Sequence, residues 1–363
     1  MSGISGPEDQ AQVSQEGMPY IHNLTPFSAA ALPSVSFDDQ QLIVVVVAGR
    51  FSMPMPFQSS STESSIAHEQ APVPLADEYR GDPGASSLLL EGQSTHVRLG
   101  TDIYLEGRAW APLGRPCTSS MVGLSVGQCR RTAVVFGDRV WRDGMLGATA
   151  SSPRPFTSMP LTYERCFGGS PPDASGAVAL ASEHNPVGRG LFARRRDAIG
   201  GLLPNIEDPN APIASISDRP RPIGFGPVAR HWRPRRDYGG TYDDLWQQSR
   251  APLWPKDVDP RVMNAAAPGL VACPWLVGGE PVRLVGLHPD GPIEFSLPTV
   301  FLQAKFESRR RLERYRMRLD GLRLEPDDGS FTLYWRAAAV ADPDLFELQS
   351  IIVRQLSRWE IEG

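Results

Sequence analysis

The chain has 363 residues, of which 34 are glycine and 35 are proline, with 36 basic against 41 acidic residues. Glycine and proline make up nearly a fifth of the chain, above the usual share of about 12%, and because helix interiors tolerate neither, an all-helical bundle is excluded. The 41% apolar content excludes disorder of the whole chain, and the net charge of −5 provides no global attraction to nucleic acid or to anionic membranes.

The first 150 residues predict a disordered tail followed by an antiparallel β region over 19–150. Residues 1–18 are polar and contain no basic region before an apolar stretch, so we expect a disordered tail without a secretory signal. Leu42–Phe51 is rich in β-branched residues and predicts a strand buried on both faces, whereas Ser59–Ser65 predicts a mobile loop. Short strand-like runs between turn residues then indicate antiparallel meanders: Ser87–Leu90, Val97–Leu99, Ile103–Ala109, Met121–Val126 and Thr132–Val140.

Residues 151–275 hold 18 prolines and 12 glycines with few periodic runs. Because a structureless loop of this length is uncommon inside a compact protein, we predict an ordered but irregular coat. Its prolines lower the entropy lost on ordering. Its aromatic residues pin it in place: Tyr163, Phe167, Phe225, Trp232, Tyr238, Tyr242, Trp246 and Trp254.

Residues 276–341 predict a C-terminal β meander. Pro281–Leu287 and Ile293–Leu297 are joined by a strong turn signal, His288–Gly291, and a hairpin is expected around Glu325–Gly329. In the second strand of that hairpin, Phe331–Trp335, large apolar residues alternate with Thr332 and Tyr334, which indicates a half-buried strand.

Residues 342–363 predict an amphipathic helix. Asp342 is a suitable N-cap, Pro343 fits the first helical position, and apolar residues recur every three or four positions, at Leu345, Leu348, Ile352, Leu356 and Trp359. The predicted fold is therefore mainly β, with antiparallel sandwich- or barrel-like sheets, a long Pro/Gly-rich irregular segment and a C-terminal amphipathic helix.

Cysteine, histidine and glycine patterns give no support for a cofactor or metal. Cys117, Cys129, Cys166 and Cys273 form no CxxC pair, and the six histidines show no HxH or HExxH spacing, so we expect buried, reduced thiols and no metal site. No glycine-rich stretch has the phosphate-binding spacing of a nucleotide site. The longest apolar run, Leu42–Ala48, is far shorter than the roughly 20 residues that span a bilayer, so we expect a soluble cytoplasmic protein without membrane insertion.

Two clusters of polar residues suggest possible functions, a hydrolase site and a nucleic-acid-binding face. His231 lies in the run Arg230–Arg236, close to Asp237, Asp243 and Asp244, where a hydrolase base could lie, although no nucleophile motif accompanies it. A structural aromatic and arginine cluster is the commoner meaning of such a pattern. Arg309–Arg318 is the strongest basic cluster and could bind nucleic acid. Its alternation of Arg314, Arg316 and Arg318 with Tyr315, Met317 and Leu319 favours a solvated strand face over a core face.

Twelve short strings, in order along the chain between Asn23 and Trp335, resemble the bacterial family named domain of unknown function 2169. They are Asn23–Phe27, Ala76–Tyr79, Phe136–Trp141, Met159–Gly169, Asn185–Gly190, Leu203–Pro209, Gly224–Pro227, Arg230–Trp232, Gly240–Asp243, Asp259–Arg261, Asn264–Ala266 and Gly278–Val282. The resemblance implies a protein encoded among type VI secretion genes, without enzymatic activity. It implies an adaptor or chaperone that loads a toxic effector with a PAAR or PAAR-like region onto the VgrG spike.

The residues agree with this implication in one respect. Tryptophan, tyrosine and arginine dominate protein interfaces, and they gather in the irregular segment, where no catalytic constellation is evident. The candidate partner-binding residues are Arg230, His231, Trp232, Arg233, Tyr242 and Trp246. Since aromatic residues dominate cores as well as interfaces, the sequence leaves open whether this cluster is surface or core.

Overall fold

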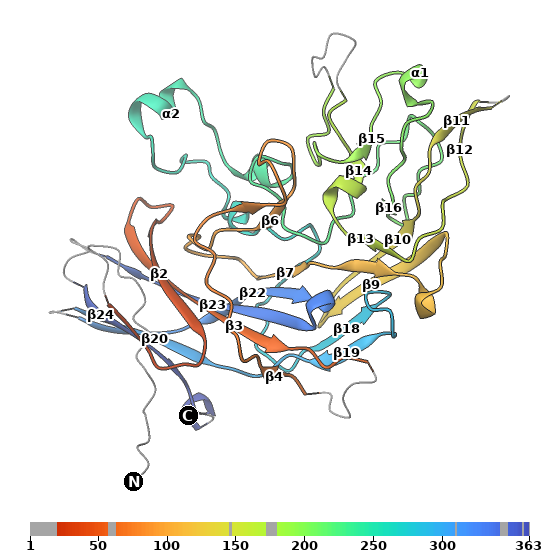
Figure 1. Cartoon of the computed structure of the whole chain (residues 1–363). Coiled ribbons are helices and arrows are strands. Elements are labelled where there is room, and N and C mark those ends of the chain that lie inside the picture. The colour runs from red at the N-terminus through yellow and green to blue at the C-terminus, as the bar shows by residue number, and fades with distance from the viewer. Residues whose placement is uncertain are drawn as a thin grey trace.

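Strands from both halves of the chain form the central sheet (Figure 1). The computed structural model describes residues 20–56, 63–144, 147–171, 180–308, 311–341, 348–357 and 359–362. Within this part the sheet has the order β17, β7, β22, β23, β3, β2, with β4 paired to β3. The bounds are Ser28–Val35 (β2), Gln41–Ser52 (β3), Ser65–Ile66 (β4), Thr101–Leu105 (β7), Val271–Ala272 (β17), Arg318–Glu325 (β22) and Ser330–Val340 (β23). β7 and β22 run parallel, and the other neighbours run antiparallel.

Two further sheets lie towards opposite ends of the central sheet in Figure 1. One is wholly antiparallel, in the order Ile206–Glu207 (β16), Cys129–Phe136 (β10), Ser119–Val126 (β9), Pro281–Val285 (β18) and Ile293–Ser296 (β19). The other has the order Tyr20–Asn23 (β1), Leu348–Gln355 (β24), Leu302–Ser308 (β20) and Leu312–Arg316 (β21), with β1 and β24 parallel. The predicted mainly β fold with antiparallel sheets is therefore confirmed.

The remaining elements are short. The strand pairs are Glu78–Tyr79 (β5) with Leu88–Leu90 (β6), Arg108–Trp110 (β8) with Ser158–Pro160 (β13), Trp141–Gly144 (β11) with Gly147–Ala150 (β12), and Phe167–Gly168 (β14) with Arg189–Gly190 (β15). The α-helices are Arg195–Ala198 (α1), Asp244–Ser249 (α2) and Trp359–Glu362 (α3), and the 3₁₀ helices are Pro112–Gly114 (η1), Tyr163–Arg165 (η2), Arg235–Tyr238 (η3), Pro260–Met263 (η4) and Pro326–Asp328 (η5). No helix in the described ranges has the length and apolarity needed to cross a membrane.

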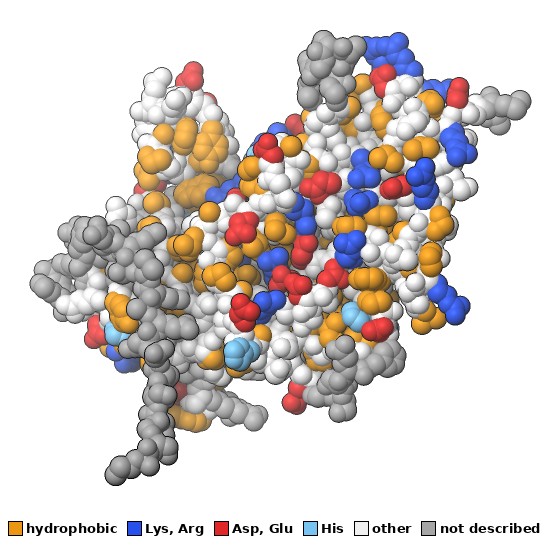
Figure 2. Space-filling model, viewed as in Figure 1, with side chains coloured by type: hydrophobic (Ala, Val, Ile, Leu, Met, Phe, Trp, Pro, Cys, Tyr) orange, Lys and Arg blue, Asp and Glu red, His pale blue; other side chains and the backbone are white. Residues whose placement is uncertain are grey.

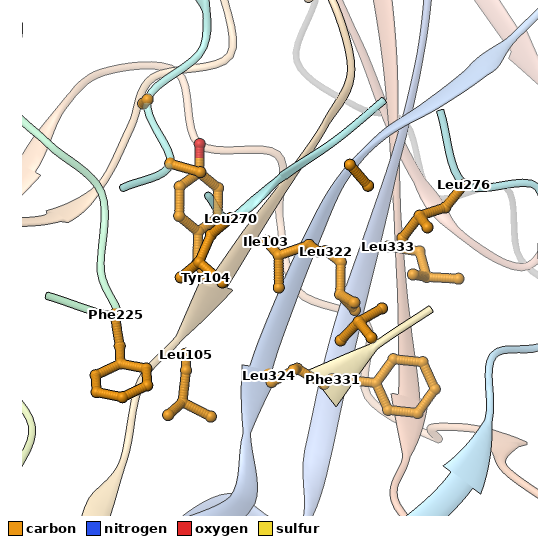
Figure 3. Close-up of a cluster of buried hydrophobic side chains, with 14 of the residues drawn as sticks. Ile103, Tyr104, Leu105, Phe225, Leu270, Leu276, Leu322, Leu324, Phe331 and Leu333 are labelled. Atoms are coloured by element: carbon orange, nitrogen blue, oxygen red, sulfur yellow. The ribbon is translucent and has the colours of Figure 1, made fainter. Parts of the chain in front are cut away.

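One apolar cluster joins the three sheets. Figure 3 shows its centre, where Ile103 and Leu105 of β7 lie beside Leu322 and Leu324 of β22. The ring centroid of Phe331, on β23, lies 5.0 Å from that of Phe295 on β19, and the same cluster includes buried residues of β20 and β24. Because burying one such side chain contributes about 1.5–3 kcal/mol, this shared core fixes how the sheets pack on one another.

The central strands confirm one burial prediction and correct another. Residues 42–49 of β3 are all buried, as expected for a strand covered on both faces. The predicted hairpin is also present, since β22 and β23 pair across η5. β23 is not half-buried, however, because Thr332 and Tyr334 are buried as well. On this face Tyr334 and Val44 pack in a second apolar cluster with Val73, which comes from a segment outside the sheet.

The predicted C-terminal helix is wrong for residues 348–355, which form strand β24 between β1 and β20. Ile351 and Val353 point into the core and are fully buried, while Ile352 between them is half-buried. The apolar spacing satisfied a helical period, but the β-branched run Ile351–Val353 favours a strand, and two neighbouring strands were available to pair with it. Asp342, Pro343 and Leu345 lie outside the described residues.

Other local expectations are met in part. Val97–Leu99 forms no strand, and the side chain of Arg98 within it is fully buried. Cys166 is buried, and burial raises its pKa to about 12. The expectation of buried thiols holds for Cys166 alone among the four cysteines, because Cys117 and Cys129 are half-buried and Cys273 is exposed. The predicted tail over 1–18 and most of the predicted loop Ser59–Ser65 lie outside the described residues.

The irregular segment divides into two kinds of structure. Its described residues, 151–171 and 180–275, hold only elements of 2–6 residues. Four of its aromatic residues, Tyr163, Phe167, Phe225 and Trp232, are buried in the body of the protein. The stretch that follows η3 leaves the body and carries α2 (Figure 1).

We expect Phe331→Ala to lower the free energy of unfolding by about 3–5 kcal/mol, because it leaves a cavity beside the rings of Phe51 on β3 and Phe295 on β19. Urea unfolding followed by tryptophan fluorescence measures this loss. The matched control, Val340→Ala, lies at the exposed end of the same strand and should cost far less. Equal losses in the two variants would contradict the proposed position of the core.

Candidate partner-binding site

The six predicted binding residues lie on one excursion of the chain. We call residues 239–258, between η3 and η4, the arm, and residues 230–233, which precede η3, its foot. Figure 1 shows α2 standing clear of the sheets, above β2. The arm carries Tyr242 and Trp246, and the foot carries the other four residues. The structure therefore brings the predicted residues to one region, although not all of them reach the surface.

The arm is held in shape by its own hydrogen bonds. Asp243 caps α2, since its Oδ1 accepts from the backbone N–H of Trp246 at 2.8 Å. The indole Nε1 of Trp246 donates to the carbonyl oxygen of Leu253 at 2.9 Å, and the rings of Tyr242 and Trp246 meet edge to face at 4.7 Å. The Asp257 carboxylate accepts from the backbone and the hydroxyl of Thr241, which lowers its pKa and closes the base of the arm.

The arm also docks on the turn between β2 and β3. The guanidinium of Arg250 pairs with the Asp39 carboxylate, with nitrogen to oxygen distances of 2.8 and 3.1 Å. The indole Nε1 of Trp254 donates to the carbonyl oxygen of Val35 at 3.3 Å, and its ring meets Phe37 edge to face. These contacts fix the base of the arm, so α2 is presented to solvent on a supported stem.

Apolar side chains are exposed on this projection. Leu245 is 71% exposed and Tyr242 is 55% exposed, while Trp246 is half-buried beneath them. Figure 2 shows hydrophobic side chains gathered on the projection. Scattered exposed hydrophobic residues are ordinary on protein surfaces, but aromatic and aliphatic residues grouped on a supported projection are typical of interface anchors.

The foot carries two charged side chains, of which Arg230 reaches the arm. Arg230 lies 4.0 Å from the Glu91 carboxylate and 6.0 Å from the ring centroid of Trp254. Arg233 pairs with Glu183 at 2.9 Å and with Asp237 at 3.0 Å. Both guanidinium groups remain partly accessible to solvent, so they can contribute to an interface next to the arm.

Trp232 does not belong to the surface. Its side chain is only 1% exposed, and its ring meets that of Tyr163 edge to face at 5.4 Å within the main core. The sequence left surface and core open for this cluster, and the structure assigns Trp232 to the core. A partner could contact it only if the protein unfolded locally.

His231 is exposed, and the carboxylates near it in sequence have other partners. Within the described ranges it makes no hydrogen bond with Asp237 or Asp243. Asp237 is paired with Arg233, and Asp243 caps α2. Partial burial lowers the pKa of His231, and the charge of Asp77 opposes this shift. The structure therefore does not bring His231 together with either of the two carboxylates that sequence proximity suggested.

Arg235, at the start of η3, lies between the foot and the arm and is buried inside the protein. Its Nε donates to the carbonyl oxygen of Val262 at 2.7 Å, and its Nη1 donates to that of Val228 at 3.0 Å. Its Nη2 pairs with the carboxylate of Glu91. Burial opposes ionisation of Glu91, but Arg235 and Arg98 outweigh this effect and lower the pKa of the carboxyl group.

This pair is one end of a buried network of charges. Arg98 pairs with Glu91 at 2.9 Å, with Asp102 at 3.2 Å and with Asp320 at 3.6 Å. Asp320 in turn pairs with Arg336 at 2.6 Å. Three guanidinium groups thus face three carboxyl groups, and all six side chains are buried. The charges balance within the network, which favours a structural role over a catalytic one.

Sequence reasoning missed this network because its members are far apart in the chain. The sequence held one indication of the network. Arg336 is the one charged residue in the otherwise mostly apolar stretch Phe331–Val340, whose length and composition indicate a strand buried on both faces. A charge at such a position requires a buried partner. The identity of that partner, Asp320, depends on the register of β22 against β23.

Four of the strings quoted for the family resemblance meet at Asn205. Its Oδ1 accepts from Arg165 and from Arg189, each at 3.1 Å. Its Nδ2 donates to Asp138 at 3.0 Å and to the carbonyl oxygen of Phe136 at 3.1 Å. The amide of Asn205 is buried and fully bonded, so these strings are joined by a structural contact at some distance in sequence from the arm.

A cavity of about 220 Å³ lies beneath η3 and η4. Its lining is mostly apolar, with Arg235 and Asn264 among the polar residues and the exposed Cys273 also contributing. It is smaller than the usual small-molecule site of roughly 300–1,000 Å³. No group of three or more His, Cys, Asp or Glu side chains in the described ranges could hold a metal ion.

Residues 38–336 match the family described as "Uncharacterized protein conserved in bacteria (DUF2169)". The match covers most of the 363-residue chain, so the chain belongs to this family. The matched range includes the arm, its foot and the buried charge network. No curated protein and no solved structure matches the chain.

We expect Glu91→Gln to lower the free energy of unfolding by about 3–5 kcal/mol, because it leaves two buried arginines short of one negative charge. Chemical denaturation measures the loss. The control is Glu294→Gln, which breaks the exposed pair between Arg283 and Glu294 and should cost less than about 1 kcal/mol. A cost for Glu91→Gln no larger than that of the control would contradict the network's role.

We expect the protein to lose stability as pH falls from about 6.5 to about 4 through His96, in addition to any titration of carboxylates. Burial, together with the charge of Arg336, lowers the pKa of His96 to about 4, and its Nδ1 has no hydrogen-bond partner among the described residues. In the unfolded chain His96 has a pKa of about 6.5. Between pH 6.5 and 4 it is therefore protonated in the unfolded state and neutral in the folded state, so lowering the pH favours unfolding. His96→Leu should flatten this part of the stability profile, as measured by urea unfolding across the range. An unchanged slope would show that His96 does not contribute.

Proposed function

We propose that this member of the domain of unknown function 2169 family is a non-enzymatic adaptor or chaperone that binds a type VI secretion effector. In this proposal the effector has a PAAR or PAAR-like region, binding takes place in the bacterial cytoplasm, and the complex is brought to the VgrG spike. Family membership, with the secretion role that the resemblance implies, supports the choice of partner. The arm supports the choice of a binding role.

The observation that carries the proposal is the exposure of Tyr242 and Leu245 on a stem held by Arg250 and Trp254. These exposed apolar side chains are not needed for packing, because the arm contacts the rest of the protein through other residues. A surface that is already ordered before binding loses little conformational entropy when the partner arrives. This arrangement therefore favours the arm as one anchor within a larger interface.

The arm alone is small for a specific interface. Stable protein interfaces bury about 1,200–2,000 Å² in total, which is more than two side chains can supply. We therefore include the exposed residues of the foot, Arg230, His231 and Arg233, in the proposed surface. Apolar anchors with a polar and charged rim are the usual composition of such surfaces. Trp232 is excluded because it is buried.

Co-expression with the effector encoded beside this protein tests the proposal. We expect the effector to be retained on the tagged protein and to stay soluble. The double variant Tyr242→Ala and Leu245→Ala should weaken binding by about thirtyfold or more, since loss of an interface hot spot costs about 2 kcal/mol. Because these residues lie outside the core, the thermal unfolding midpoint should not change.

The matched control is Leu113→Ala, which truncates an exposed leucine on η1 and should bind like the wild type. Wild-type affinity in the double variant would remove the arm from the interface. An effector that stays soluble and is secreted in cells without this protein would overturn the adaptor function itself.

A further inference from the structure

The outer side of β21 has no strand partner among the described residues. β21 is the last strand of the four-stranded sheet and pairs with β20 on one side only. No other described strand pairs with its outer side. An unpaired edge presents a row of backbone N–H and C=O groups to any chain that can extend the sheet.

The register decides which backbone groups point outwards. Met317 donates its N–H to Leu302, and Ser308 donates to Arg311, each at 2.9 Å, so these opposed residues are hydrogen-bonded pairs. Such pairs alternate along an antiparallel ladder, which makes Ala304 with Tyr315 and Phe306 with Glu313 the pairs between them. The N–H and C=O groups of residues 312, 314 and 316 therefore point away from β20.

The side chains along this edge carry uncompensated positive charge. Arg314 and Arg316 of β21 form no ion pair with any described residue, and neither does Arg318, which begins β22. Arg316 lies over the ring of Phe301 at 4.3 Å, and Arg318 lies over the ring of Trp275 at 4.1 Å. Stacking leaves the edges of a guanidinium free to bind carboxylates. Arg309 and Arg310, which belong to the same predicted basic cluster, lie outside the described residues.

The other face of β21 carries Tyr315 beside Glu313, whose carboxylate accepts a hydrogen bond from the Tyr315 hydroxyl at 2.7 Å. Ala304 and Phe306 of β20 are buried on this face. Tyr315, opposite Ala304, is partly exposed, and its ring meets that of Phe306 edge to face at 5.8 Å. A strand added beside β21 would place alternate side chains against arginines on one face and against Tyr315 on the other.

We propose that the outer edge of β21 binds, by strand addition, an extended segment of a protein partner in which acidic residues alternate with apolar ones. The open edge supplies main-chain pairing, the alternating arginines select acidic residues, and Tyr315 selects apolar ones. This inference goes beyond the proposed function, because it holds whichever protein the arm binds. Arm and edge lie in different parts of the structure, with α2 above β2 and the sheet of β20 below it in Figure 1.

A peptide explains the edge better than a nucleic acid does. Phosphate oxygens accept hydrogen bonds from arginine and from backbone N–H groups, but they leave the row of outward C=O groups without donors. The net charge of −5 also provides no long-range attraction for a polyanion. The remaining alternative is that the arginines only guard the edge against aggregation, as charged residues on edge strands often do.

Fluorescence anisotropy with a labelled peptide of alternating glutamate and valine tests the proposal, with a peptide of alternating lysine and valine as control. Arg314→Ala removes a charge but keeps the outward N–H. Arg314→Pro removes the same charge and the N–H, without breaking a bond to β20, since proline is tolerated at outward edge positions. We expect the wild type to bind only the acidic peptide, Arg314→Ala to weaken binding severalfold, and Arg314→Pro to weaken it at least tenfold further.

Each other outcome overturns the proposal. Equal binding by the alanine and proline variants would mean that no main-chain pairing occurs. Tighter binding of a single-stranded oligonucleotide than of the acidic peptide would mean that the edge binds nucleic acid. Binding of neither ligand would mean that the arginines only protect the edge strand against aggregation. If Arg314→Pro fails to fold, Leu312→Pro tests the same edge, because that N–H also points outwards. The double variant Tyr242→Ala and Leu245→Ala should bind the peptide normally, which separates this inference from the role of the arm.

Discussion

The balance of three buried arginines against three buried carboxyl groups is the interaction on which the architecture depends. Arg98 and Glu91 come from the loop before β7, Asp102 from β7, Asp320 from β22 and Arg336 from β23, while Arg235 belongs to η3. A buried charge without a partner costs several kcal/mol. If one of these segments were displaced, the buried charges of the others would lose their partners. The network therefore couples the central sheet to the segment from which the arm emerges.

This coupling explains how an irregular segment can carry a defined surface. Residues 151–275 have little regular secondary structure, yet their first part is pinned by buried aromatic rings and their second part by Arg235 and by contacts of the arm with the β2–β3 turn. Proline reduces the entropy that such a segment loses on ordering. Side chains that are not needed for packing, such as Leu245, are then free to serve recognition.

The two proposed surfaces would bind their partners through different interactions. The arm offers apolar anchors surrounded by charge, whereas the edge of β21 offers backbone hydrogen bonds and unpaired arginines. Both belong to the same body, since one apolar core joins the three sheets. Two separate surfaces on one protein would allow two partners to be bound at the same time, in keeping with the proposed adaptor role.

By itself the sequence determined the mainly β class, the buried strand Leu42–Phe51, the hairpin around Glu325–Gly329 and the region that holds the candidate site, because each depends on residues that are close in the chain. It misassigned residues 348–355, whose apolar spacing fits a helix as well as a strand, and it left open whether Trp232 is surface or core. Only the tertiary structure decided those points, the pairing of Arg336 with Asp320 and the open edge of β21. Each of these depends on which distant segment covers a face, and local pattern carries no information about distant neighbours.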